Sequence, residues 1–242
     1  MGIKAIIRSY YLPVIDNRHH RYLSWEHCYG YFRGVSSNKI SQDLNQAALQ
    51  LGFYLASWGM YRGSSFLLQY TYTVHIECIA VLAEEKFKPL WEHEFGAGKY
   101  DDTQLMKLIV EVINEIKTVY KTAYKPFVLH EGSQQPTDTL ISKILLGTFG
   151  CLPACDRFFI DGFKECGNKF SNLNLQFIQL ISDFCKSNID ELIEVQNEIK
   201  DSTGFHYPMM KLVDMYYWQI GENIDKNRNN VQVAKRGQTA IG

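Results

Sequence analysis

A short segment of the chain combines a lysine, a tight turn and an aspartate in a pattern that suits catalysis. Lys143 stands in an otherwise apolar run, and Asp156 follows the turn-forming residues Gly147, Gly150 and Pro153. An aspartate at the start of a helix accepts backbone N–H groups, which hold its carboxylate fixed and ionised. Such a carboxylate stabilises a developing positive charge, for example the oxocarbenium ion that forms when a glycosidic bond breaks. The segment is therefore the first candidate for a catalytic site.

Each of these two residues also has a purely structural interpretation. Aspartate is a favoured N-cap residue, so Asp156 fits a helix start without any chemistry. Lys143 fits a side chain that snorkels from an apolar helix and carries its charge to the surface. The sequence leaves both interpretations open.

A second candidate is the glycine- and serine-rich break WGMYRGSS at 58–65. Trp58, Tyr61 and Arg62 supply two aromatic rings and a guanidinium, which suit a pocket for a flipped nucleotide base. The alternative is that Trp58 belongs to the core, where large aromatic side chains are usually buried, and that Arg62 pairs with an acid.

Phosphate contacts are predicted for two groups of basic residues. Lys117, Lys121 and Lys125 recur every four residues and share one helix face, and Arg157 directly follows Asp156. The alternative for the lysines is a solvated face that complements the helix dipole.

Helical patterns dominate the elements that must position these residues. Residues 103–124 carry a continuous apolar stripe behind an acidic start, and residues 139–150 are apolar on nearly all sides, which indicates a helix in the middle of the structure. The turn CLPACD then leads to a helix that opens at Asp156. Further helices are predicted at the following residues: 41–57, 73–83, 170–187, 189–200 and 206–221.

The ends of the chain give weaker patterns. Residues 4–15 are apolar and β-branched with Pro13 near the end, which predicts an edge strand or an extended arm. Residues 26–40 read as a loop because of their glycines and serines. The sequence thus predicts an all-α domain of about eight helices over 1–221, with a possible small β addition at the N-terminus. Residues 222–242 are polar and are predicted to be a loose tail.

Bulk composition limits the class of protein. Hydrophobic residues make up 46% and charged residues 21% of the 242 residues, which is enough apolar material for a single core. The net charge of −1 excludes a protein that binds nucleic acid by bulk positive charge, so any such contact must come from a local basic face. The N-terminal residues lack the pattern of a signal peptide, and no apolar run approaches a membrane span.

Six cysteines raise the question of disulfides or a metal. Without a secretion signal they are predicted to be reduced thiols in the cytoplasm. Cys151 and Cys155 are four residues apart, which does not match the spacing of a zinc ribbon. Buried, inert cysteines and no cofactor are therefore expected, while a metal-dependent enzyme that uses the Cys and His residues stays an alternative.

The run TLISKILLGTFGCLPACDRFFIDGF (139–163) resembles the core of the helix-hairpin-helix DNA glycosylase superfamily. In that family an apolar helix precedes a turn with a Pro-x-Asp-like element, and the aspartate opens the next helix as the catalytic carboxylate. The resemblance places this role at Asp156 and puts Lys143 on the helix where bifunctional members keep a nucleophilic lysine. The Leu-Pro-Gly-x-Gly hairpin of the family is absent from the chain.

The resemblance implies a glycosylase-like helical domain that acts on double-stranded DNA and excises a flipped, modified base. Divergent bacterial members do this in base-excision repair or in defence against phages. The class of protein that competes with this hypothesis is a non-catalytic helical interaction or regulatory module, which the near-neutral charge favours. Neither the base nor the oligomeric state follows from the sequence.

Overall fold

The computed structural model describes residues 2–35, 37–63, 65–92, 102–124 and 136–239. Within these residues the chain forms helices and no strand, which confirms the all-α class and contradicts a small β addition. The described α-helices are α1 (Ile3–Ile15), α2 (Leu23–Gly34), α3 (Ser37–Gln42), α4 (Leu44–Ser57), α5 (Ile76–Leu82), α6 (Lys88–Glu92), α7 (Asp102–Tyr124), α8 (Asp138–Gly147), α9 (Arg157–Glu165), α10 (Leu175–Ser187), α11 (Ile189–Thr203) and α12 (Met209–Thr239). Short 3₁₀ helices are η1 (Phe66–Gln69), η2 (Tyr72–His75) and η3 (Glu85–Phe87).

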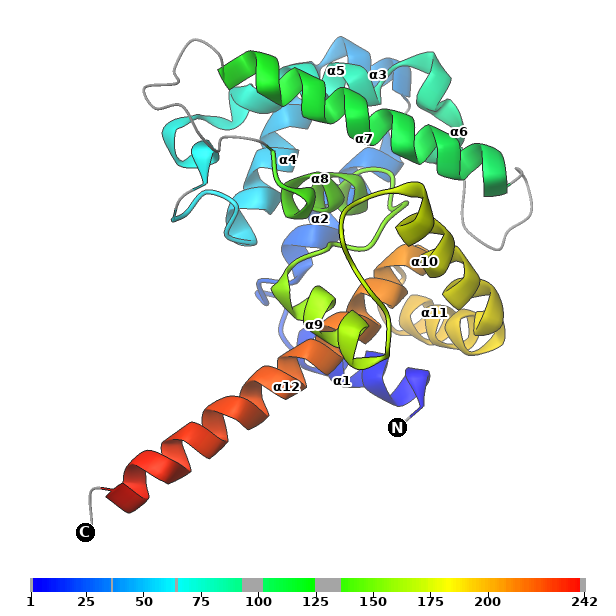
Figure 1. Ribbon diagram of the computed structural model, residues 1–242. Helices are drawn as coiled ribbons and strands as arrows, with labels where there is room; N and C mark the ends of the chain where they lie inside the picture. Colours follow the sequence, from blue (N-terminus) through cyan, green and yellow to red (C-terminus); the bar gives the residue numbers. More distant parts are fainter. Residues whose placement is uncertain (1, 36, 64, 93–101, 125–135, 240–242) are drawn as a thin grey trace.

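Helix α8 lies in the middle of the fold (Figure 1), where it contacts α2, α4 and α7. Every residue from Leu140 to Gly150 is buried, as the apolar character of this run predicts. Helix α7 crosses one end of the molecule and packs on α5, α6, α8 and α10. Its predicted stripe is confirmed, because Leu105, Ile109 and Ile116 are buried at helical spacing.

The N-terminal segment is a helix, so the predicted strand or arm at 4–15 is wrong. Ile3, Ile7, Tyr10 and Val14 repeat every three or four residues and are buried together on one face. Pro13 lies in the last turn of α1. The β-branched residues and this proline suggested a strand, but the spacing of the buried residues is helical.

The predicted loop at 26–40 is also wrong, because α2 and α3 occupy most of it. Gly30 lies inside α2 and faces the ring of Phe205, where an added Cβ would approach Phe205 to 3.1 Å. This glycine therefore serves close packing and does not break the helix.

The break at Trp58-Gly59 is confirmed, since α4 ends at Ser57 and Gly59 has a φ of +73°. Asp43 is the N-cap of α4 and accepts the backbone N–H of Gln46 at 2.9 Å, so this helix begins slightly later than predicted. Helices predicted at 73–83, 170–187 and 189–200 are confirmed with shifted ends as η2 with α5, α10 and α11.

Helices α9 and α12 form the most extensive helix contact in the described structure. Two glycines allow it: a Cβ on Gly162 would overlap the carbonyl oxygen of Tyr217, and a Cβ on Gly221 would overlap that of Phe158. The backbones therefore approach more closely than any larger residue permits. This contact fixes α9, and hence Asp156 at its start, against α12.

The prediction that the last helix ends at Gly221 is wrong. This glycine lies inside α12, where it allows close packing against α9. Helix α12 continues to Thr239, so the segment predicted as a loose tail is helical over most of its length. Figure 1 shows its outer part extending away from the other helices. In the part of the chain that is described, no helix has the length and apolar character needed to cross a membrane.

Candidate functional site

The turn between α8 and α9 is held by hydrogen bonds on both sides. Ser142 Oγ accepts the backbone N–H of Cys155 at 2.8 Å, and Thr139 Oγ1 donates to the Cys155 carbonyl at 2.9 Å. Asp156 then caps α9, since its Oδ1 accepts the N–H of Phe159 at 3.2 Å. The predicted helix start at Asp156 is thereby confirmed, and its carboxylate has a fixed direction.

Lys143 reaches the same carboxylate from α8. Its Nζ lies 3.3 Å from Asp156 Oδ2, and the two side chains are 4% and 18% exposed. Lys143 therefore does not carry its charge to the surface. Burial lowers the pKa of Lys143 below its usual value, while the negative charge of Asp156 acts in the opposite direction. The structure thus brings together the two residues that the sequence singled out for catalysis.

A second buried pair lies beside the first and was missed in the sequence. Lys211 Nζ lies 2.8 Å from Asp214 Oδ2, with both side chains 4% exposed. Asp214 Oδ1 accepts the backbone N–H of Ala154 at 3.0 Å, so α12 also holds the turn that presents Asp156. Burial raises the pKa of Asp214, and the charge of Lys211 opposes that rise. Two charged residues within the apolar run PMMKLVDMYYW were the signal for this pair.

We call Lys143, Asp156, Lys211 and Asp214 the Lys–Asp cluster. Opposite charges balance within it, which reduces the cost of burying each one. The cluster differs from an ordinary buried ion pair in one respect: Asp156 keeps a partly exposed carboxylate, whereas its three partners are almost completely buried.

Aromatic rings surround the two lysines. Lys143 Nζ lies 4.8 Å from the ring centroid of Trp58, and Lys211 Nζ lies 5.1 Å from that of Trp25. Trp58 stacks on Tyr22 at 5.1 Å between centroids, and Tyr22 stacks on Tyr10 at 4.9 Å. Trp58 and Tyr22 are half-buried, and the ring of Trp58 also lies 5.7 Å from Lys211 Nζ, so it contacts both lysines. The structure thus places Trp58 beside Lys143.

Tyr61 belongs to a different buried group. Its hydroxyl lies 2.7 Å from His75 Nε2, and His75 Nδ1 lies 2.6 Å from the Tyr120 hydroxyl. We call these three residues the histidine bridge. Burial lowers the pKa of His75 from 6.5 to about 3 and raises that of Tyr61 to about 12. His75 and Tyr61 are therefore neutral across the physiological range.

The remaining predicted contacts are dispersed. The Arg62 side chain lies against Gly59, Lys117 Nζ pairs with Asp138 at 2.8 Å, and Lys121 is exposed on α7. Lys125 lies outside the described residues. Arg157 pairs with Asp225 of α12 at 2.8 Å, and its guanidinium lies 4.5 Å from the ring centroid of Phe158.

The cysteines and histidines do not form a metal centre in the part of the chain that the structure describes. No group of three or more His, Cys, Asp or Glu side chains there has the arrangement to hold a metal ion. All six cysteines are free thiols; Cys166 is exposed and the others are buried. Burial raises the pKa of each buried thiol, for example that of Cys78 to about 12, so these thiols are unreactive at neutral pH.

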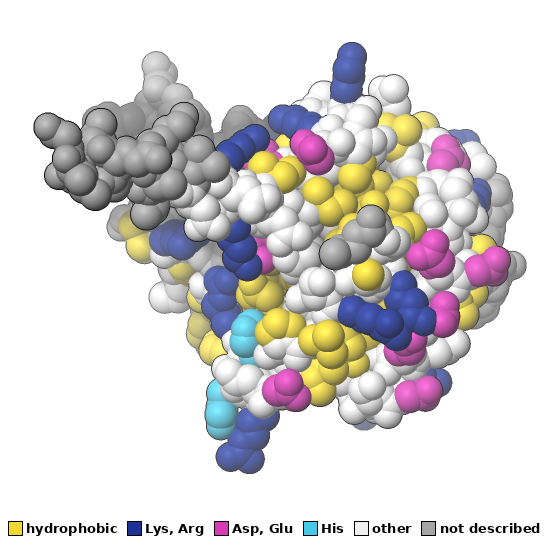
Figure 2. Space-filling model, turned by 90° about the horizontal axis from the view of Figure 1, so that it is seen from below, with side chains coloured by type: hydrophobic (Ala, Val, Ile, Leu, Met, Phe, Trp, Pro, Cys, Tyr) yellow, Lys and Arg dark blue, Asp and Glu magenta, His cyan; other side chains and the backbone are white. Residues whose placement is uncertain are grey.

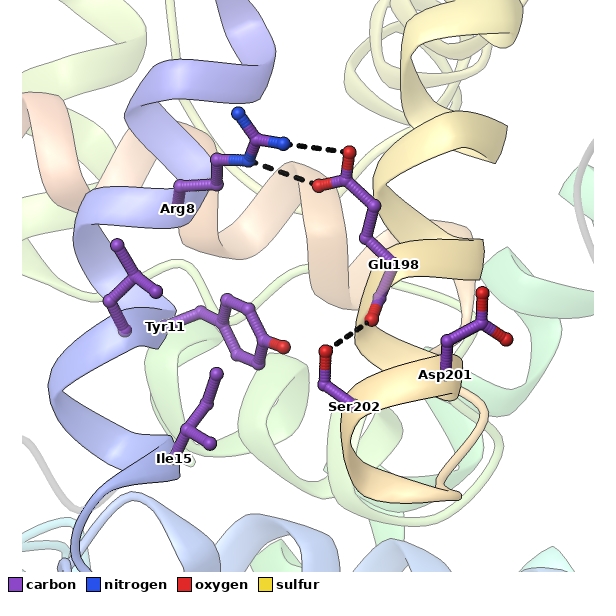
Figure 3. A pocket seen from close by; sticks show the side chains of 7 residues that line it. Arg8, Tyr11, Ile15, Glu198, Asp201 and Ser202 are labelled. Atoms are coloured by element: carbon purple, nitrogen blue, oxygen red, sulfur yellow. Dashed lines mark hydrogen bonds and ion pairs between the residues drawn. The ribbon is translucent and has the colours of Figure 1, made fainter.

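A cavity of about 610 Å³ lies away from Asp156, between α1 and α11 (Figure 3). Leu12 and Ile15 expose 54% and 38% of their surface beside it. Arg8 crosses the cavity to bind Glu198 through two hydrogen bonds of 3.0 and 2.7 Å. The complete lining is Arg8, Tyr11, Leu12, Ile15, Glu198, Asp201 and Ser202.

Comparison with protein-family models, curated proteins and solved structures found no match to this chain.

Proposed function

We propose that this protein is a DNA glycosylase that hydrolyses the N-glycosidic bond of a flipped, modified base. The observation that carries the proposal is the position of Asp156: a capped carboxylate, 3.3 Å from a buried lysine and still 18% exposed. A carboxylate fixed in partly desolvated surroundings stabilises a cationic sugar more strongly than one in water. The resemblance of residues 139–163 to helix-hairpin-helix glycosylases supports the same assignment.

The reaction assigns a separate role to each residue. As the bond from C1′ to the base nitrogen breaks, the electron pair leaves with the base and Asp156 stabilises the cation that forms at C1′. Water then bonds to C1′ while Asp156 accepts its proton, and that proton passes through solvent to the departed base. Lys143 is a positioning residue, because its Nζ directs Oδ2 of Asp156 while the N–H of Phe159 holds Oδ1.

The base must reach Asp156 past the aromatic stack. Trp58 and Tyr22 are the half-buried rings next to the Lys–Asp cluster, and in this proposal the incoming base displaces Trp58 from Lys143 and stacks in its place. Displacement breaks a cation–π interaction of about 0.5–2 kcal/mol, the hydrogen bond of 3.1 Å from Trp58 Nε1 to Ser24 Oγ and the stacking on Tyr22, and the binding of the nucleotide has to offset all three.

Asp156→Asn tests the proposal, with Asp183→Asn as the matched control on an exposed helix face. Both variants and the wild-type protein are incubated with duplex DNAs that carry a panel of modified pyrimidines and purines, and abasic sites are counted. We expect the wild type and the control to release a base from at least one DNA, and Asp156→Asn to lose roughly 100-fold or more in rate. Equal release by wild type and Asp156→Asn would remove Asp156 from the mechanism.

The cavity between α1 and α11 favours a second candidate function, a protein-interaction module. Exposed Leu12 and Ile15 provide an apolar wall, and Asp201 adds an exposed carboxylate beside it. A peptide with a basic side chain next to leucine or methionine fits this chemistry. Binding of such peptides by the wild type, lost in Asp201→Lys, together with no base release from any DNA, would favour this function.

A further inference from the structure

The link between α1 and α2 contains four consecutive basic residues, Arg18-His19-His20-Arg21. Hydrogen bonds give this link a defined shape: the backbone N–H of His20 donates to the Asn17 carbonyl at 2.8 Å, and that of His19 donates to Asn17 Oδ1 at 3.0 Å. We call residues 16–22 the basic loop. Its four basic side chains are thus held on a folded turn.

Hydrogen bonds also fix which imidazole nitrogens carry protons in the neutral rings. His20 Nδ1 accepts the backbone N–H of Tyr22 at 3.3 Å, so its proton is on Nε2. His19 Nε2 accepts from Arg18 Nε at 3.1 Å, so its proton is on Nδ1. Each ring therefore keeps one N–H donor that these bonds do not use.

The basic loop lies at the edge of the proposed active site. The guanidinium of Arg21 is 5.4 Å from the ring centroid of Tyr22 and 5.1 Å from that of Trp58. Trp58 in turn contacts Lys143, the partner of Asp156. A chain of direct contacts thus joins the loop to the carboxylate.

The arginines of the loop differ from the other cations near Asp156. Arg157 is paired with Asp225, and Lys226 is paired with Glu222. The interactions described for Arg18 and Arg21 are with His19, the Ser57 carbonyl and aromatic rings, none of which carries a negative charge. Within the described residues their positive charges are therefore available to an external anion.

The surface of the molecule also shows a concentration of basic side chains. Seen from below, Lys, Arg and His side chains gather along one edge of the molecule (Figure 2). On α12, Asp225 pairs with Arg157 and Glu222 pairs with Lys226, so these carboxylates are already matched by cations. The near-neutral chain thus has a local basic edge, which its net charge of −1 does not reveal.

We propose that the basic loop binds backbone phosphates of the DNA strand whose nucleotide enters the Asp156 site. Arginine donors in a fixed turn suit phosphate oxygens, and the N–H groups of His19 and His20 add further donors. This proposal rests on the proposed function. It assigns phosphate contacts to the basic loop and not to Lys117, which is paired with Asp138.

The test measures binding separately from base release. A fluorescent duplex of about 20 base pairs is titrated with wild-type protein, Arg18→Gln/Arg21→Gln and the control Lys39→Gln/Lys107→Gln over a range of salt concentrations. The control removes the same charge from exposed sites on α3 and α7. We expect the loop variant to bind roughly tenfold more weakly per arginine, and its slope of log K against log salt to fall by about two.

Thermal unfolding of each variant shows that a loss of binding is not a loss of fold. An equal effect of the loop and control variants would overturn the loop proposal, and so would the absence of DNA binding by the wild type. Stronger loss of binding to single-stranded RNA or to anionic lipid vesicles than to the duplex would also overturn it. Loop-dependent binding without release of any base would support the loop and contradict the glycosylase.

Discussion

The Lys–Asp cluster and the histidine bridge are two buried polar groups that avoid an unpaired buried charge in different ways. In the cluster, Lys143 and Lys211 are paired with Asp156 and Asp214, so charge is retained and balanced. In the bridge, burial lowers the pKa of His75 to about 3, so charge is removed. A buried group needs either an opposite charge or loss of its own charge, because isolated ions are poorly solvated in a helical core.

The difference shows where chemistry is to be expected. Hydrogen bonds to Tyr61 and Tyr120 occupy both nitrogens of His75, and the ring is completely buried. Asp156 is held as firmly, but its side chain is 18% exposed. Only the cluster therefore combines a fixed charge with access, and the bridge is a structural element that stabilises the packing of η2 on α7.

Removal of Asp214 is expected to give the largest effect on stability. Asp214→Ala leaves Lys211 without its ion-pair partner and the Ala154 N–H without an acceptor, so the free energy of unfolding should fall by about 3–5 kcal/mol. Urea unfolding measures this loss of unfolding free energy, and the exposed Asp183→Ala variant is the control. A loss no larger than that of the control would show that the cluster is not a paired group.

The histidine bridge should respond to acid in a predictable direction. The folded pKa of His75, about 3, is below its unfolded value of 6.5, so the stability it contributes is present above pH 6.5 and is lost as pH falls toward 3. The stability difference between wild type and His75→Gln should therefore shrink by about 1.4 kcal/mol per pH unit below pH 6.5. A difference that stays constant from neutral pH to pH 4 would contradict the neutral bridge.

Lys143 should matter less to stability than Asp214. Lys143→Met keeps the apolar stem against Trp58 and leaves Asp156 without its lysine, but solvent reaches that carboxylate. We expect a loss of about 1–2 kcal/mol in urea unfolding, smaller than that of Asp214→Ala. A larger loss than for Asp214→Ala would reverse the ranking of the two pairs.

The smallest effect is expected at Tyr61. Tyr61→Phe removes the hydroxyl that lies 2.7 Å from His75 Nε2 and leaves the rings in place, which should cost about 1 kcal/mol. It should also leave DNA binding unchanged if Tyr61 is part of the bridge and not of a base pocket. Weaker DNA binding in this variant would restore the substrate-binding role that the sequence predicted for Tyr61.

Local patterns predicted much of the helical fold, and long-range packing explains where they failed. Asp156 at its helix start and the stripe of α7 follow from residues close in sequence. Gly221 reads as a helix end, yet it lies inside α12 because the Phe158 carbonyl approaches it. No local pattern contains that contact.

The sequence also predicted only part of the candidate site. Lys143 and Asp156 are near one another in the chain and meet in space, whereas Asp214 reaches the turn from α12. Trp58 and Tyr61 are in one short turn but point into different groups, toward Lys143 and His75. Sequence spacing alone does not separate these two directions.

The most direct test of the account compares two aspartates in one assay: single-turnover base release and urea unfolding for Asp156→Asn and Asp214→Asn. The account predicts that Asp156→Asn loses roughly 100-fold or more in release rate and loses less stability than Asp214→Asn, while Asp214→Asn mainly loses stability. Release at the wild-type rate by a folded Asp156→Asn protein would contradict the assignment of chemistry to this carboxylate.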